Sequence, residues 1–181
     1  LRIRYKFLAQ LLLALAIASM LYFDLGIDFV NASFFDILRL NIFYIPFAAF
    51  TIISFANAVN ISDGLDGLAS GLLLICLVAF LIISGAILDT TLSTFLGLWI
   101  GALIAFLYFN VFPARIWLGD VGALSFGATL AVCGLLLGKP IALAIIGGVF
   151  VVEVASSLIQ LLSKKFRHKK IFEVSPIHLW L

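Results

Sequence analysis

The sequence has few charges. Only 11% of its 181 residues are charged, whereas 65% are hydrophobic. An ordinary soluble domain is about 45–50% apolar and about 25% charged. This scarcity of charge excludes a soluble globular domain, a disordered chain and a nucleic-acid-binding protein. Cysteine is also scarce: the two residues, Cys76 and Cys133, lie in separate apolar stretches, which excludes a cysteine-based metal or redox motif.

Long apolar segments make up most of the chain. Six of them run over about residues 7–23, 42–56, 68–84, 95–109, 123–138 and 141–162. A membrane-spanning helix needs about 20 mostly apolar residues, and polar residues at the ends of the shorter segments are expected to extend them. The segments do not alternate in hydrophobicity, and lipid requires every backbone polar group to be paired, so we expect helices. The predicted fold is all-α, a polytopic integral membrane protein with about six transmembrane helices in one domain over residues 1–181.

The basic residues are distributed unevenly between the two sides of this predicted bundle. Six spans place residues 57–67, residues 110–122 and both chain ends on one side. That side carries nine of the eleven Lys and Arg residues, whereas Arg39 and Lys139 lie on the other. Because basic residues favour the cytoplasmic side, we expect the side with nine to face the cytoplasm.

The densest polar segment is NAVNISDGLDGLASG, residues 57–71. Asn57, Asn60, Asp63 and Asp66 recur every three residues, and a glycine follows each aspartate. One interpretation is a pair of helix caps around a tight turn. Two amides and two acids in ten residues also suit Mg²⁺ and the phosphate oxygens that accompany it, and we favour this second interpretation.

A second polar segment, FNVFPARIWLGDVGALSFG, covers residues 109–127. Asp120 lies between glycines at a predicted helix start and by itself is typical of an N-cap. Trp117 is typical of a residue at the membrane interface. Its alternative role is a flat surface on which a base stacks, a contact worth about 1–3 kcal/mol.

The last apolar segment carries Glu153, Ser156, Ser157 and Gln160 at helical spacing on one face. An acid inside a span costs about 2.5–3.5 kcal/mol, so Glu153 is expected to face a cavity or to hydrogen-bond a neighbouring helix. A basic run follows and is typical of an anchor on anionic lipid. His178 comes after it, directly behind Pro-Ile.

Taken together, these segments resemble the polyprenyl-phosphate N-acetylhexosamine-1-phosphate transferase superfamily. Residues 57–71 resemble its NxxNxxDGxDGLA motif, residues 109–127 its FNxxPAxxFMGDxGSLxLG motif, and residues 147–178 the last part of its pattern. The resemblance implies transfer of a sugar-1-phosphate from a UDP-sugar to a polyprenyl phosphate in the bacterial plasma membrane. The reaction takes place on the cytoplasmic side, releases UMP and needs Mg²⁺. The Pro-Ile-His element favours the branch that transfers phospho-N-acetylmuramoyl-pentapeptide to undecaprenyl phosphate in peptidoglycan synthesis.

The resemblance also implies roles for individual residues and allows a homodimer. Asp120 matches the acid that binds Mg²⁺. The catalytic positions are matched by Asp63, Asp66, Asp120 and His178, and the substrate-binding positions by Asn57, Asn60, Asn110, Trp117 and Gln160. Trp117 stands where the family has a Phe that stacks on uracil.

Three departures from the family pattern leave alternatives open. No Asp-Asp pair occurs, Leu179 and Trp180 replace two of three histidines after Pro-Ile, and Ala123 replaces a serine. From the first, we expect the sequence to be the C-terminal portion of a longer transferase and to be inactive alone. The second keeps open a UDP-N-acetylglucosamine-type transferase for another glycan. A transporter subunit is a third interpretation, disfavoured because the acids of the motifs gather on one side.

Overall fold

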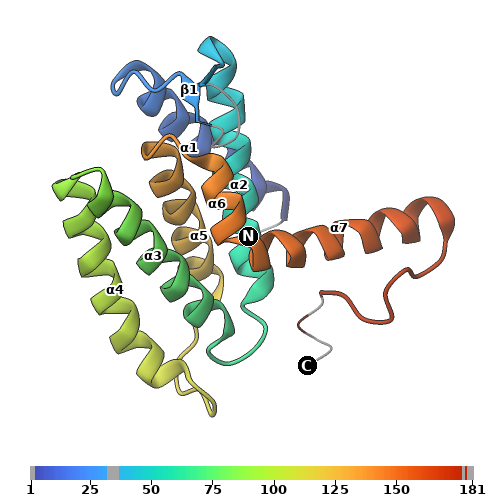
Figure 1. The fold of residues 1–181 in the computed structure, drawn as a ribbon. Coiled ribbons are helices and arrows are strands. Elements are labelled where there is room, and N and C mark those ends of the chain that lie inside the picture. The colour runs from blue at the N-terminus through green and yellow to red at the C-terminus, as the bar shows by residue number, and fades with distance from the viewer. Residues whose placement is uncertain (1–2, 32–36, 177, 179–181) are drawn as a thin grey trace.

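The computed structural model of the protein describes residues 3–31, 37–176 and 178. Leu179 and Trp180, the substitutes in the histidine run, lie outside the described residues. Figure 1 shows the order of the elements along the chain. They are α1 (Ile3–Phe23), β1 (Phe29–Val30), β2 (Leu38–Arg39), the 3₁₀ turn η1 (Asn41–Phe43), α2 (Tyr44–Ser62), α3 (Leu68–Ala86), α4 (Thr90–Asn110), α5 (Gly119–Leu136), α6 (Pro140–Ile146) and α7 (Gly148–Arg167).

Helices α1 to α5 are long and apolar enough to cross a membrane, and the bent pair α6–α7 can count as a sixth span. The prediction of an all-α polytopic membrane protein is therefore confirmed. The helices also extend past the apolar segments into polar residues, as expected. Helix α2 continues to Ser62, and α4 runs from Thr90 to Asn110.

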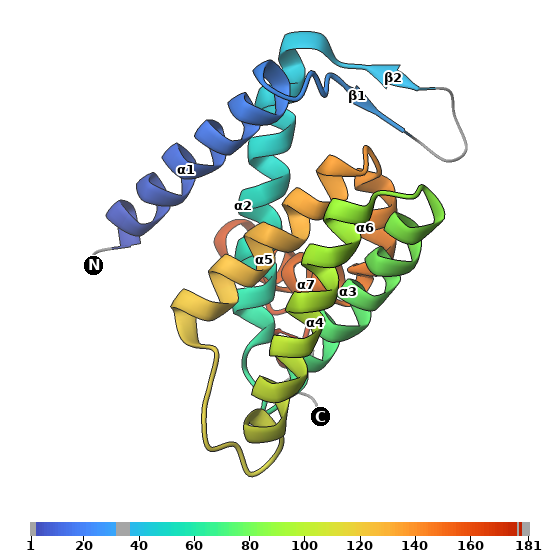
Figure 2. The ribbon, with the colours of Figure 1, turned by 90° about the vertical axis from the view of Figure 1, so that its left-hand side faces the viewer.

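Helix α2 is the centre of the bundle and packs against α1, α3, α5 and α7 (Figure 2). Its contact with α5 is close because small residues face each other. A Cβ on Gly127 of α5 would collide with the backbone of Phe55 and Ala56. Small residues of this kind let two helix backbones approach closely in a membrane, where no hydrophobic force drives helices together.

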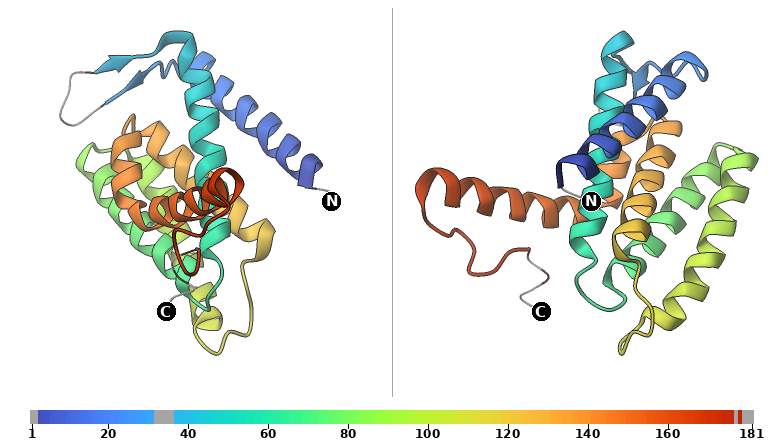
Figure 3. Two further views of the ribbon diagram at one scale, coloured as in Figure 1. Left: turned by 90° about the vertical axis from the view of Figure 1, so that its right-hand side faces the viewer. Right: turned by 180° about the vertical axis from the view of Figure 1, so that it is seen from behind.

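The sixth apolar segment differs from the prediction of one helix over residues 141–162. It breaks at Gly147, and α6 and α7 meet at an angle of 81°. Two consecutive glycines, Gly147 and Gly148, weaken the helix at this point. A Cβ on Gly147 would also collide with the ring of Phe55, so the bend packs directly against α2. Helix α7 consequently projects sideways from the bundle (Figures 1 and 3).

A short hairpin lies at one end of the bundle and was not predicted (Figure 2). Phe29 of β1 pairs with Arg39 of β2 in an antiparallel register. The backbone N–H of Asn31 donates to the carbonyl of Gly138 over 2.9 Å, which ties the hairpin to the segment after α5. Strands of two residues carry too little periodicity to be seen in the sequence.

Candidate functional site

The opposite end of the bundle, here called the polar end, is formed by residues 57–67 and residues 110–120. These segments connect α2 to α3 and α4 to α5. The residues at the N-cap positions of α3 and α5, Gly67 and Leu118, make no side-chain cap hydrogen bond. Asp66 and Asp120, which lie next to these helix starts, bind other groups with their carboxylates.

Asp66 joins the two connecting segments of the polar end. Its Oδ2 accepts a hydrogen bond from the backbone N–H of Ala114 over 2.9 Å, and its Oδ1 accepts from the indole N–H of Trp117 over 3.1 Å. The indole is held by its edge, and Trp117 remains 65% exposed. The arrangement presents a fixed aromatic ring at the surface of the polar end.

Asn110 supports the same connection from inside. It is buried at the last position of α4, where its side-chain N–H donates to the carbonyl of Ile116 over 2.9 Å. Its Oδ1 accepts a hydrogen bond from the hydroxyl of Ser70 in α3. Both ends of the amide are thus occupied by the protein, and Asn110 fixes the path of residues 111–118.

The carboxylate of Asp120 receives one contact from each of two other helices. Asn60 of α2 donates to Oδ1 over 2.9 Å, and the ammonium of Lys6 in α1 lies 2.7 Å from Oδ2. The Asp120 side chain nevertheless stays 67% exposed. From the sequence, Lys6 is expected only to mark the cytoplasmic side, because nothing in the chain order links it to residue 120. Its position in the first turns of a span on the same predicted side was the one available signal.

Asp63 lies between these contacts and the C-terminal segment. Partial burial raises the pKa of the Asp63 carboxyl above its usual range, and a hydrogen bond from the Gly119 backbone N–H offsets part of this rise. The next residue, Gly64, faces His178, because a Cβ on Gly64 would overlap the Nε2 atom of that ring. The turn at 63–64 therefore touches both the start of α5 and His178.

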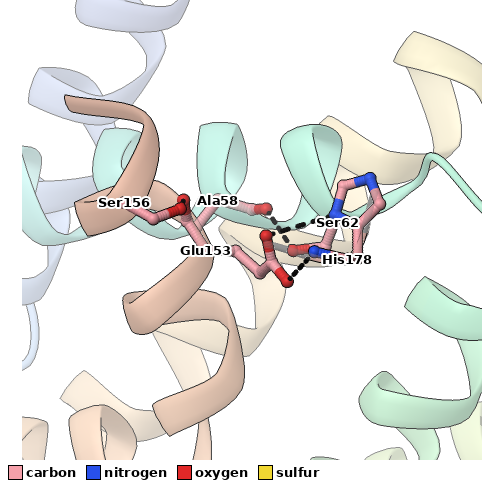
Figure 4. Close-up of polar contacts among 5 residues, drawn as sticks. All are labelled: Ala58, Ser62, Glu153, Ser156 and His178. Atoms are coloured by element: carbon pink, nitrogen blue, oxygen red, sulfur yellow. Dashed lines mark hydrogen bonds and ion pairs between the residues drawn. The ribbon is translucent and has the colours of Figure 1, made fainter. Parts of the chain in front are cut away.

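His178 is held by the acid of α7, as Figure 4 shows. The backbone N–H of His178 donates to Oε1 of Glu153 over 3.0 Å, and its Nδ1 lies 3.2 Å from Oε2. Both residues are about 95% buried. Glu153 therefore has a partner, and the Nδ1 atom of His178 is directed at its carboxyl group. The Nε2 atom faces the turn at Gly64.

Two of the predicted substrate-binding residues, Asn57 and Gln160, make their hydrogen bonds outside the polar end. The amide of Asn57 donates to Gln10 of α1 over 3.1 Å and to the carbonyl of Ile53. Gln160 of α7 accepts from the backbone N–H groups of Ile171 and Phe172 and donates to the carbonyl of Phe172. Gln160 thus anchors the returning C-terminal segment.

The donor atoms at the polar end can be compared with what Mg²⁺ requires. Across the residues that the structure describes, no three His, Cys, Asp or Glu side chains are arranged to hold a metal ion, so Asp63, Asp66 and Asp120 do not form a three-carboxylate cluster. Mg²⁺, however, is usually bound by one or two carboxylates together with waters and substrate phosphates. The exposed carboxylate of Asp120, with the amide of Asn60 beside it, fits that mode of binding.

Comparison with known proteins agrees with the motifs. The profile of glycosyl transferase family 4 matches residues 1–138. The phospho-N-acetylmuramoyl-pentapeptide-transferase of Caldanaerobacter subterraneus subsp. tengcongensis is 39% identical over 98% of this chain and 56% of its own length. The proteins of that name from Staphylococcus carnosus and Thermodesulfovibrio yellowstonii are 38% and 39% identical over 97% of this chain, and 56% and 54% of their own lengths. The chain spans about half the length of these relatives, and it belongs to glycosyl transferase family 4.

Proposed function

We propose that the protein transfers phospho-N-acetylmuramoyl-pentapeptide from its UDP-linked donor to undecaprenyl phosphate, releasing UMP. The polar end then faces the cytoplasm, where the donor is found, and the bundle gives access to the lipid acceptor. The names of the relatives support this proposal for the whole protein. The 181 residues contain no Asp-Asp pair, and we expect no UMP release from them by themselves.

The observation that carries the proposal is the environment of Asp120. A carboxylate that served only the helix would cap its first turn, but this one is exposed and is approached by Asn60 and Lys6. Its charge is therefore available to a cation that accompanies a pyrophosphate. Mg²⁺, when bound there, would supply positive charge that offsets the charge developing on the transferring phosphoryl group.

Trp117 and Asp66 are proposed to form the base-binding part of the site. The carboxylate of Asp66 holds the indole N–H and thereby fixes the plane of the ring. A fixed, exposed ring loses little freedom when a uracil base stacks on it, so binding costs less than with a mobile side chain. Asn110 contributes indirectly, because it fixes the segment that carries Trp117.

His178 is proposed to act next to Asp63, with Glu153 as its positioning residue. The ring reaches the turn at 63–64 through its Nε2 atom, while Nδ1 is committed to Glu153. Nε2 can therefore accept a proton or a hydrogen bond at the polar end. Burial raises the pKa of Asp63, and shifts in this direction also occur at catalytic acids.

The proposal is tested by measuring UMP release from the whole protein with both substrates present. Activity should require Mg²⁺ and undecaprenyl phosphate, and Asp120→Asn should lower the rate by orders of magnitude, since the loss of a metal costs several kcal/mol of transition-state stabilisation. Asp24→Asn is a matched control, because Asp24 follows α1 at the other end of the bundle. Wild-type activity in Asp120→Asn would refute the assignment of Asp120.

The same assay distinguishes the alternative functions. Turnover with UDP-N-acetylglucosamine and none with the muramoyl-pentapeptide donor would identify the other branch of the superfamily. Flux of a charged solute across vesicles, without UMP release, would identify a transporter. The elution volume of the whole protein in size-exclusion chromatography tests whether it is a homodimer.

A further inference from the structure

The end of α7 carries a cluster of cations that the proposed transferase reaction does not use. Five basic residues fall within seven positions: Lys164, Lys165, Arg167, Lys169 and Lys170. All five are exposed. Within the described part of the chain none of them forms an ion pair, although Glu173 lies only three positions beyond Lys170. Five exposed like charges repel one another, so the cluster favours a bound anion.

Two buried polar side chains hold the turn that presents these cations. The chain reverses at His168, which has a left-handed backbone with φ +52°. The hydroxyl of Ser163 donates to the carbonyl of Lys169 over 2.8 Å and closes the turn. Gln160 makes its three hydrogen bonds to residues 171 and 172, just beyond it. This clustered arrangement of cations is therefore fixed by the fold.

The turn also encloses a depression of about 480 Å³. Its lining consists of Ser163, Arg167, Lys169, Lys170 and Ile171. Three of these five residues are cationic, and Ser163 closes the turn from inside. A space of this size with convergent cations suits a phosphate ester, which binds both ammonium and guanidinium groups well.

The rest of the exposed surface of α7 is apolar, which indicates where the ester comes from. Helix α7 leaves the bundle at a steep angle, because the bend at Gly147 is 81° (Figure 3). Its polar residues turn inward, whereas Leu158, Leu161, Leu162 and Phe166 are more than half exposed. A helix that projects sideways from a bundle of membrane-spanning helices, with apolar side chains outward and cations at its tip, matches a position at the boundary between acyl chains and head groups.

We propose that the turn at residues 163–171 is a binding site for the head group of an anionic phospholipid, such as phosphatidylglycerol. The phosphate occupies the depression between Arg167, Lys169 and Lys170, and the acyl chains lie along the apolar outer side of α7. The site is separate from Asp120, Trp117 and His178, and it does not depend on the proposed transferase reaction.

The test is a titration of the detergent-solubilised protein with phosphatidylglycerol, followed by native mass spectrometry. Cations near a membrane surface contribute about 1 kcal/mol each, so K169Q/K170Q, which removes two of them, should weaken the Kd about thirtyfold. R39Q/K139Q removes the same charge from the other end of the bundle and should leave the Kd unchanged. Equal Kd values for the two double variants would overturn the proposal.

Two further arms address the geometry and the source of the phosphate. Ser163→Ala keeps all five cations but removes the hydrogen bond that closes the turn, and it should also weaken lipid binding. Unchanged binding in a folded Ser163→Ala protein would refute a fixed site. Excess inorganic phosphate should not displace the lipid; displacement would show that the site takes free phosphate instead. Thermal unfolding in the same detergent identifies variants that fail to fold. If K169Q/K170Q fails to fold, the lipid affinity of Ser163→Ala decides whether the turn is the binding site.

Discussion

The Lys6 ammonium and the Asp120 carboxylate form an ion pair of 2.7 Å, although 114 positions separate them in the sequence. The contact joins the start of α1 to the start of α5, and Asn60 of α2 binds the second oxygen of the same carboxylate. Three helices therefore meet at one side chain. If Asp120 binds a divalent cation as proposed, that cation must compete with the ammonium of Lys6 for Oδ2.

Removal of this ammonium should favour a metal ion. If Asp120 is the metal ligand, we expect Lys6→Met to bind Mn²⁺ about threefold more tightly than the unmodified protein, because the ion no longer competes with Lys6 for Oδ2. The signal of free Mn²⁺ in electron paramagnetic resonance measures this affinity. Arg4→Met removes the same charge from the same helix but no described ion pair, and it should have little effect. Equal affinities in the two variants would contradict competition at Asp120.

The tautomer of His178 should depend on Glu153. In Glu153→Gln the amide N–H₂ group would face Nδ1, so the ring proton should move to Nε2 and the free acceptor at Gly64 should be lost. If His178 acts in the proposed transfer, the rate of the whole protein should fall at least about tenfold, as in wrong-tautomer variants of catalytic histidines, with little change in KM. ¹⁵N chemical shifts of the imidazole report the tautomer directly. An unchanged tautomer would show that Glu153 only fills space.

Gly64 should tolerate no side chain. Gly64→Ala puts a methyl group where the His178 ring lies, so either the ring or the turn must move. The melting temperature and the transfer activity should both fall. The matched control is Gly71→Ala in α3, where an added Cβ meets no atom within 4 Å. Because alanine is the better helix residue, this control should gain about 0.5–1 kcal/mol. Equal melting temperatures in the two variants would argue against contact between His178 and the turn.

Asp63 should lower stability at neutral pH. Its pKa is raised in the folded protein, so the folded state binds the proton more tightly than the unfolded state. Stability from this group is present below the ordinary aspartate pKa of about 3.9 and is lost as pH rises through the raised value. With metal chelated, Asp63→Asn should therefore melt at a higher temperature than the unmodified protein at pH 7, while the difference disappears near pH 3.

For the neighbouring acid Asp66, we expect replacement by Asn to lower the melting temperature, the opposite of Asp63→Asn. Asp66 accepts hydrogen bonds from Ala114 and Trp117, and the amide can replace only one of its two acceptor oxygens. Its melting temperature at pH 7 should fall. The measurement is thermal unfolding of Asp63→Asn and Asp66→Asn at several pH values. This account would be contradicted if both melting temperatures shifted in the same direction at pH 7.

The apolar segments predicted the helices because backbone polar groups in lipid must be paired, and a helix pairs them within the segment. The break at Gly147 was missed because hydropathy continues unchanged across it. The break packs against the ring of Phe55, which lies 92 positions before Gly147 in the sequence. A Gly-Gly pair inside an apolar segment was the available signal.

The residues that lie at the polar end could be predicted better than the contacts that they make. Spacing and residue type singled out Asp63, Asp66 and Asp120, since all three lie at span boundaries on one side. Which group each carboxylate binds depends on how α1, α2 and α5 are packed, and side-chain partners across helices leave no periodic trace. For that reason Lys6 was missed, and Gln160 was not foreseen as the anchor of the C-terminal segment.

The contact between Glu153 and His178 has a consequence for biosynthesis. Residue 153 leaves the ribosome 25 positions before the residue that satisfies it. During that interval a carboxyl group enters the membrane with its final neighbour still in the exit tunnel. The helices around α2 can associate earlier, because their contacts lie within residues already made. The contacts of His178 with Glu153 and with the turn at Gly64 can therefore form only after residue 178 has been made, later than the contacts among α1 to α5.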